Sequence, residues 1–222
     1  MPVQRSLVSD QVFRLLCADV LAGRYEPGEM LPTQRRLAAD LGVNMASVRE
    51  AVKRLEQLRL VESRQGDGMR VRDWRSAGGL DVLAHLVLRA GRFDPGTLRA
   101  VMEARRVMLA EAARLAAERR SDEQAARLGE IAARIEADEG DAQSLDFAFF
   151  TELVEASGNI VFVLVTNSIR EIYFEHADAF APMLATPATP YLRAAAAIEA
   201  GDGAKAARAV RELASSQEAA LG

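Results

Sequence analysis

The chain has 222 residues, of which 50% are hydrophobic and 27% are charged, and it carries a net charge of −4. This composition excludes a disordered polymer and predicts one large or two modest folded domains. The single cysteine excludes an intramolecular disulfide and a cysteine-built metal site, and it favours a reducing, intracellular environment. The acidic net charge, taken over the whole chain, argues against a nucleic-acid partner.

The charge is unevenly distributed along the chain. Residues 1–75 contain 13 Lys and Arg against 10 Asp and Glu, a net charge of +3, whereas residues 76–222 carry −7. The first ten residues contain no apolar segment of signal-peptide length, and the longest dense apolar run, Ile160 to Val165, is shorter than the roughly 20 residues of a membrane span. We therefore expect a soluble, cytoplasmic protein with no membrane partner, whose basic part is its first third.

Three helices are predicted in the first 60 residues. Apolar residues recur at helical spacing over residues 7–21, and a second helix is expected from Thr33 to Leu41. A third is expected to follow Asn44, a favourable N-cap, and to end near Gln57. Its apolar residues form one stripe: Val48, Val52, Leu55 and Leu58. Two short helices joined by a tight turn are typical of a helix-turn-helix.

A β-hairpin is predicted after the third helix. Residues 60–63 and 69–72 are strand-like, and Gln-Gly-Asp-Gly at 65–68 suits the tip between them. A helix-turn-helix followed by a hairpin is a winged helix, so residues 1–73 are expected to form a DNA-binding domain. Residues 74–79, with two adjacent glycines, are expected to be a linker.

The remainder of the chain, residues 80–222, is predicted to be an all-α bundle with no strand after residue 75. Its abundant alanine favours helix and close helix packing. Helices are expected over residues 80–90, 95–120, 122–138, 143–156, 159–181, 188–200 and 203–219. The predicted fold class is therefore mainly α: an N-terminal winged helix-turn-helix followed by an all-α helical-bundle effector domain.

The start of the third helix is the strongest candidate for contact with DNA. Arg35 and Arg49 fit guanine edges or phosphates, while Asn44, Ser47 and Gln65 offer further hydrogen bonds. Exposed arginines on a helix can also be no more than a solvated face. Their coincidence with helix-turn-helix spacing and a glycine-rich hairpin tip favours double-stranded DNA as the partner.

Residues 28–56, beginning GEMLPTQRRLAADLGVN, and the run LVESRQGDG at 60–68 resemble the winged helix of GntR-family bacterial transcription regulators. The rest of the chain resembles the helical effector domain of the FadR subfamily, most closely its fatty-acid-responsive members. The resemblance implies a palindromic operator bound by a homodimer. Together with the residues above, it gives the expected DNA contacts as Arg35, Asn44, Met45, Ala46, Ser47, Arg49, Gln65 and Gly66.

Two of these positions depart from the family. Met45 stands where an arginine is usual, and a thioether donates no hydrogen bond to guanine or phosphate. Gln65 replaces a histidine at the wing tip but retains a donor. The operator sequence of relatives is therefore not expected to apply here.

Many of the relatives that the second domain resembles hold a divalent metal with one aspartate and three histidines. The resemblance places Asp146 as the first ligand and puts Phe150, Tyr191 and Leu213 at the histidine positions. Phenyl and isobutyl groups are not ligands, so we expect no metal and no other cofactor. The two histidines of the chain, His85 and His176, lie elsewhere in the sequence.

The same replacements predict an apolar cavity, which suits a long-chain acyl-CoA or fatty acid as effector. The residues expected to line it are Arg105, Asp146, Phe149, Phe150, Tyr173, Tyr191, Leu213 and Ser215. Two alternatives remain open: a small carboxylate of sugar-acid or amino-acid metabolism paired with Arg105, or aromatic residues that fill a core without any ligand. No nucleophile motif, phosphate loop or histidine set indicates an enzyme.

Overall fold

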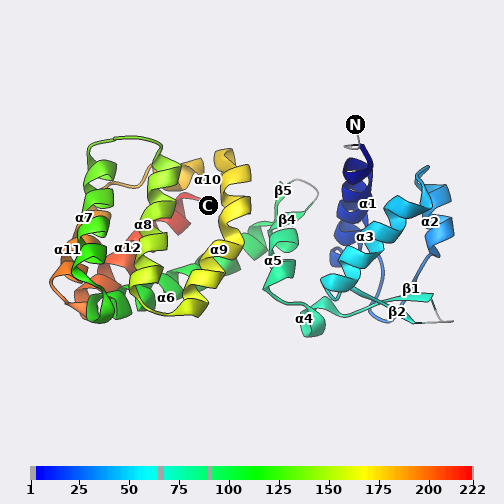
Figure 1. Cartoon of the computed structure of the whole chain (residues 1–222), viewed down its shortest axis with the longest axis horizontal. Helices are drawn as coiled ribbons and strands as arrows, with labels where there is room; N and C mark the ends of the chain where they lie inside the picture. The colour runs from blue at the N-terminus through cyan, green and yellow to red at the C-terminus, as the bar shows by residue number, and fades with distance from the viewer. Residues whose placement is uncertain (1–3, 65–67, 90–91, 222) are drawn as a thin grey trace. The chain divides into compact units, whose positions relative to one another are not determined.

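The computed structural model describes residues 4–64, 68–89 and 92–221. The contacts divide the chain into two compact units, Met1–Pro95 and Gly96–Gly222, coloured from blue to green and from green to red in Figure 1. The first unit, here called the N-terminal unit, mixes helices with short strands. The second, here called the helical unit, contains only helices among its described residues.

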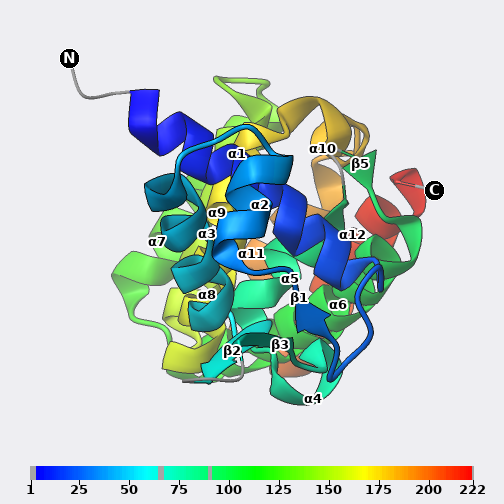
Figure 2. The same cartoon turned by 90° about the vertical axis from the view of Figure 1, so that its right-hand side faces the viewer.

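The N-terminal unit is a winged helix. Its helices are α1 (Gln4–Leu21), α2 (Gln34–Asp40), α3 (Met45–Gln57), α4 (Trp74–Ala77) and α5 (Leu80–Val87). Strands β1 (Met30–Leu31), β2 (Val61–Arg64) and β3 (Gly68–Val71) form an antiparallel sheet in the order β1-β3-β2. This sheet lies at one end of the helices of the unit (Figures 1 and 2). The predicted helix-turn-helix and hairpin are thereby confirmed.

Local sequence explains why α2 and α3 begin and end where they do. The side chain of Thr33 accepts a hydrogen bond from the backbone N–H of Arg36, and that of Asn44 accepts one from Ser47. Between the helices, Gly42 adopts φ +64°, a left-handed conformation that costs glycine little. The two helices are therefore joined by the short turn that a helix-turn-helix needs.

The core of the N-terminal unit is apolar and centres on the packing of α1 against α3. Leu16 of α1 is 1% exposed, and Val48 and Leu55 of α3 are fully buried. Cys17 is also buried, and burial raises the pKa of its thiol to about 12. The thiol therefore stays protonated at neutral pH and acts as a packing group.

The helical unit consists of helices, four of which begin at polar side-chain caps. Its helices are α6 (Pro95–Arg119), α7 (Asp122–Glu136), α8 (Ala142–Ala156), α9 (Ile160–Glu175), α10 (Ala177–Leu184), α11 (Thr189–Glu199) and α12 (Gly203–Ala220). Ser121 and Gln124 form a capping box at α7, and Asp141, Asn159 and Asp202 cap the helices that follow them. The predicted all-helical second domain is confirmed.

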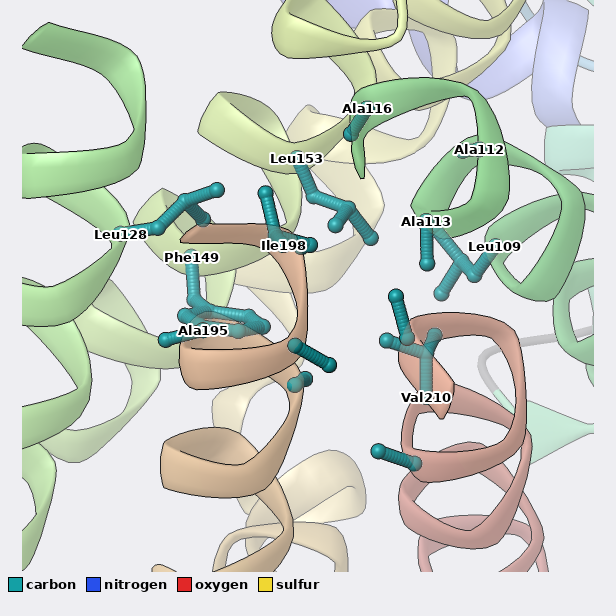
Figure 3. Packing of buried hydrophobic residues seen from close by; sticks show 14 of the residues in the cluster. Leu109, Ala112, Ala113, Ala116, Leu128, Phe149, Leu153, Ala195, Ile198 and Val210 are labelled. Atoms are coloured by element: carbon teal, nitrogen blue, oxygen red, sulfur yellow. The ribbon is translucent and has the colours of Figure 1, made fainter. Parts of the chain in front are cut away.

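Close packing of small and large apolar side chains fills the helical unit (Figure 3). Alanines of α6, such as Ala112 and Ala116, are fully buried and let neighbouring helices approach. Phe149, Leu153 and Ile198 fill the space that the alanines leave. This core surrounds the buried polar cluster described below.

Some local predictions were wrong. Strands β4 (Leu88–Arg89) and β5 (Arg92–Phe93) pair after residue 75, where no strand was expected, and β1 was also missed. Strands of two residues are too short to show an alternating pattern. The helix predicted over 159–181 is two helices, because His176 leaves helical geometry at φ −119° and ψ 42°. No glycine or proline marks that position in the sequence.

The segment between the predicted domains is partly ordered. Residues 74–79 contain α4, and α5 packs on the N-terminal unit through Val82, which is 2% exposed. The compact units divide after Pro95, whereas the sequence suggested a DNA-binding domain of 1–73 and a second domain of 80–222. That functional boundary stays a prediction.

Candidate functional site

The two faces of α3 differ sharply in exposure. Its inward stripe is buried, with Val48, Val52 and Leu55 at most 2% exposed, which fixes the helix on the core. The opposite face exposes Met45, Ala46 and Arg49 near the helix start. The first N–H groups of a helix attract anions, so this end favours phosphate.

Two of the predicted arginines are available for binding. Arg35 on α2 and Arg49 on α3 are exposed, and within the described residues neither forms an ion pair. Arg36 differs, because its Nε lies 2.9 Å from a carboxylate oxygen of Asp40. Arg35 and Arg49, together with the exposed Lys53 further along α3, thus remain free among the described residues to meet an anionic partner.

The remaining predicted DNA contacts differ from one another in exposure and hydrogen bonding. The side chain of Asn44 caps α3 through its oxygen and keeps its amide N–H groups for other partners. Ser47 differs from the expectation: it is 4% exposed and lies with the buried residues of α3 rather than on its outward face. Gln65 and Gly66 lie outside the described residues.

A second polar site is buried in the helical unit and centres on Asp146 of α8, which is 3% exposed. Its Oδ2 accepts a hydrogen bond of 2.7 Å from the hydroxyl of Tyr173 on α9. Its Oδ1 accepts a hydrogen bond of 2.5 Å from the hydroxyl of Tyr191 on α11 and one of 2.7 Å from Nε2 of Gln217 on α12. We call these four residues the Asp146 network; it joins four helices through one carboxylate.

The electrostatics of the Asp146 network keep both tyrosines neutral. Burial raises the pKa of Tyr173 and Tyr191 well above the ordinary value, and the negative charge and hydrogen bonds of Asp146 raise them further. Arg105 opposes this shift in part. Both hydroxyls therefore remain protonated donors throughout the neutral pH range.

Aromatic residues and one arginine surround the Asp146 network. Phe149 is fully buried, and its ring lies edge-on to Tyr191 with the ring centres 5.1 Å apart. The guanidinium of Arg105 lies 4.4 Å from the centre of the Phe150 ring. Nη1 of Arg105 is buried and has no hydrogen-bond partner, and the same is true of Oε1 of Gln217. An unpaired donor and an unpaired acceptor thus lie inside this unit.

The structure brings most of the predicted effector residues together, with one exception. Tyr173 and Tyr191 contact Asp146, while Leu213 is fully buried in the core that includes Phe149 and Phe150. Ser215 is exposed on α12 and is not brought to the network. The residue missed from the sequence is Gln217, one turn after Leu213 on the same helix face; a polar residue on a buried stripe was the available signal.

A cavity of about 200 Å³ lies beside the Asp146 network. Its wall is mixed rather than apolar, so the apolar cavity expected from the sequence is not found here; Asp146 and Tyr191 are its buried polar groups. It is lined by Ile135, Asp138, Gly140, Ala142, Leu145, Asp146, Leu184, Thr186, Ala188 and Tyr191. An engineered protein cavity of about 150 Å³ holds benzene, so this volume suits a compound of similar size.

The described residues contain no group of three or more His, Cys, Asp or Glu side chains placed to hold a metal. Nor is any described helix both long and apolar enough to cross a membrane.

Comparison with known proteins finds a matching family model in each of the two units. The model of the gntR family of bacterial regulatory proteins matches residues 8–71, and the FCD domain model matches residues 100–216. The transcriptional regulator Mce2R of Mycobacterium tuberculosis is 38% identical over 96% of this chain and 90% of its own length. LutR of Bacillus subtilis is 28% identical over 69% of each chain.

More distant likenesses agree with this assignment. A fatty acid metabolism regulator of Serratia proteamaculans is 28% identical over 68% of this chain and 62% of its own. The solved structure of Lar, described as controlling the agr system of Listeria monocytogenes, shares the fold with a TM-score of 0.59 at 15% identity, over 96% of this chain and 95% of Lar. The chain belongs to the GntR family of bacterial transcriptional regulators, with a gntR-type N-terminal domain followed by an FCD domain.

Proposed function

We propose that the protein binds a palindromic operator as a homodimer through α3 of each copy, and that a small molecule bound in the helical unit changes this affinity. The observation that carries the DNA part is the exposed, unpaired state of Arg35 and Arg49 beside the capped start of α3. Phosphate contacts would supply affinity, and base edges reached from the helix start would supply sequence choice. Two copies related by a two-fold axis would read two half-sites.

The DNA proposal is tested with an operator selected from random DNA by the protein itself. Arg49→Ala should weaken binding to that operator by roughly 5- to 150-fold in a gel shift, because a bidentate arginine contributes about 1–3 kcal/mol. Arg208→Ala is the matched control: it removes the same charge from an exposed position of the helical unit and should change little. Equal affinities of wild type and Arg49→Ala would refute the assignment.

A small carboxylate is the effector class that the geometry of the helical unit favours. A buried guanidinium N–H without a partner is costly, and an anion paired with Arg105 would satisfy it. A hydroxyl or amine on the same ligand would satisfy Oε1 of Gln217. The cavity of about 200 Å³, which is lined by Asp146 and Tyr191 but by neither Arg105 nor Gln217, has a size that suits a small compound.

A long-chain acyl-CoA or fatty acid is the second candidate. It is supported by relatives named fatty acid metabolism regulator and by the aromatic residues Phe149 and Phe150 beside the network. Sites for drug-sized ligands enclose about 300–1,000 Å³, more than the cavity beside Asp146. An acyl chain would therefore require the helices around the cavity to separate.

Calorimetry distinguishes the two effector classes. Under the first candidate, a panel of short hydroxy and amino acids should contain a ligand that binds wild type and is lost in Arg105→Gln. Ser215→Ala, which changes an exposed side chain of α12, should bind it like wild type. Binding of oleoyl-CoA, with none of the short acids bound, would favour the second candidate; the absence of both kinds of binding would refute an effector of either class.

A further inference from the structure

The side chains around Asp146 do not suit the metal site that the sequence resemblance suggests. The three positions that would carry histidine hold Phe150, Tyr191 and Leu213. Phe150 and Leu213 have no atom that can coordinate a metal ion, and both are at most 4% exposed within the apolar core. Only the carboxylate of Asp146 remains from such a set, whereas a structural zinc ion takes four ligands.

The carboxylate of Asp146 is already occupied by donors from within the chain. Two ionised oxygens offer about four acceptor positions, and three are filled by the hydroxyls of Tyr173 and Tyr191 and by the amide of Gln217. The hydroxyl of Tyr191 also accepts a bond of 2.9 Å from Gln217, which closes a ring of three side chains. A metal ion at this carboxylate would find only about one acceptor position open.

The geometry points to a network that takes the place of a divalent metal ion in this chain. The Asp146 network holds α8, α9, α11 and α12 together through hydrogen bonds to one buried carboxylate, and the helical unit needs no metal to do so. The bonds to Tyr191 and Gln217 join residues 45 and 71 positions apart in sequence, so they connect α8 to helices that do not follow it directly in the chain. Hydrogen bonds to a charged group are about twice as strong as neutral ones, which suits this role.

This inference does not depend on the identity of the effector. A ligand can bind in the cavity beside Asp146 whether or not a metal is present, and the metal content can be measured without ligand or DNA. Failure of the inference would therefore leave the proposed function intact, and failure of the proposed function would leave the network in place.

The first experiment measures metal in the intact protein. Wild type purified without chelator should contain far less than one equivalent of Zn, Ni, Mn or Fe by mass spectrometry, and EDTA or added Zn²⁺ should leave its Tm unchanged. One full equivalent of metal, or a Tm that falls with EDTA, would overturn the inference.

The second experiment compares two variants of the network. Tyr191→Phe removes one buried hydroxyl and should lower Tm by about 5 °C with and without chelator. Tyr25→Phe, a partly buried tyrosine of the N-terminal unit for which no hydroxyl bond is found in the described residues, is the matched control and should stay within about 1 °C of wild type. An unchanged Tm of Tyr191→Phe would show that the network does not hold the helices.

Restoring imidazoles provides the converse test. The triple variant Phe150→His, Tyr191→His and Leu213→His should gain an equivalent of Zn²⁺ or Ni²⁺, and its Tm should rise with metal and fall with EDTA. A folded triple variant that binds no metal would show that these three positions do not surround a metal site. If it does not fold, the single variant Tyr191→Phe and the metal content of wild type still decide the inference.

Discussion

The two units place the polar groups of their candidate sites differently: on the surface in the N-terminal unit and inside the core in the helical unit. In the N-terminal unit, Arg35 and Arg49 project outward, and no charged side chain among its described residues is buried. In the helical unit, Asp146 and Gln217 are 3% and 0% exposed. One short segment can supply the exposed residues that bind a macromolecule, whereas an interior site for a small molecule needs residues from several helices. The two kinds of site therefore respond differently to mutation, salt and pH.

Removal of the central carboxylate should have the largest effect. Asp146→Ala leaves the hydroxyls of Tyr173 and Tyr191 and the amide of Gln217 without their acceptor. Since each buried unpaired donor costs about 1–3 kcal/mol, we expect the free energy of unfolding to fall by about 3–5 kcal/mol. Urea unfolding followed by circular dichroism measures this loss.

The control for this change is Glu130→Ala, an exposed carboxylate on α7. Its free energy of unfolding should stay within about 0.5 kcal/mol of wild type. If both variants lose the same small amount, the helical unit does not depend on its buried polar network, and the contrast between the two units disappears.

Removal of an outward arginine should spare stability and weaken DNA binding. Arg35→Ala should cost about 1.5–3 kcal/mol of binding free energy to the selected operator and reduce the slope of log affinity against log salt concentration by about 1. Fluorescence anisotropy at several salt concentrations measures both. Arg36→Ala, whose guanidinium is already paired with Asp40, should change the slope less. Equal slopes for wild type and Arg35→Ala would place Arg35 away from phosphate.

Loss of the cap of α3 should have a smaller effect on stability. Asn44→Ala removes the acceptor for the N–H of Ser47 and should lower the free energy of unfolding by about 1 kcal/mol. Asn44→Ser keeps a capping oxygen and should recover most of that loss. If Asn44→Ser restores stability but not operator affinity, Asn44 contacts DNA in addition to capping the helix.

The response to pH should be the smallest effect and should have opposite signs in the two units. Burial, aided by the charge of Arg54, lowers the pKa of His85 below its ordinary value of 6.5, while Asp81 opposes the shift. The unfolded chain therefore binds this proton more readily, and stability should fall as the pH drops below about 6.5. His85→Gln should flatten the dependence of Tm on pH between 5 and 7.5; an unchanged slope would assign it to other groups.

Tyr173 and Tyr191 should act at the other end of the pH scale. Their pKa is raised on folding, so the unfolded chain ionises first, and the stability that they contribute is present at neutral pH and lost as the pH rises above their ordinary value of 10. Tyrosinate absorbance recorded during alkaline unfolding should appear together with the loss of helix. Ionisation before unfolding would show that the two hydroxyls are not held as buried donors.

Most of the fold was predictable because its signals are local. Asn44 and Thr33 cap the helices that they were expected to begin, and the helix predicted over 95–120 is found over Pro95–Arg119. The two-residue strands and the helix break at His176 were not predictable, because they are set by strand pairing and packing rather than by a repeating sequence pattern.

The candidate sites were predictable to different degrees. The exposed arginines of the N-terminal unit follow from helix periodicity, but Ser47 was placed on the wrong side of α3. In the helical unit, Asp146, Tyr173 and Tyr191 were expected to line one cavity, but nothing in the sequence indicated that three side chains share the carboxylate of Asp146. Ser215 was expected at the effector site, where the structure has Gln217. Residues two positions apart on a helix point about 200° apart, so Ser215 faces solvent and Gln217 faces the core.

The sequence by itself determined the helices, the wing, the uneven distribution of charge and the family, because caps, periodicity and motifs act over a few residues. Only the tertiary structure decided which polar groups meet: Asp146 is bonded to residues 27, 45 and 71 positions away. Contacts at such separations depend on how whole helices pack, and the hydrogen bonds that fill this carboxylate are a property of that packing.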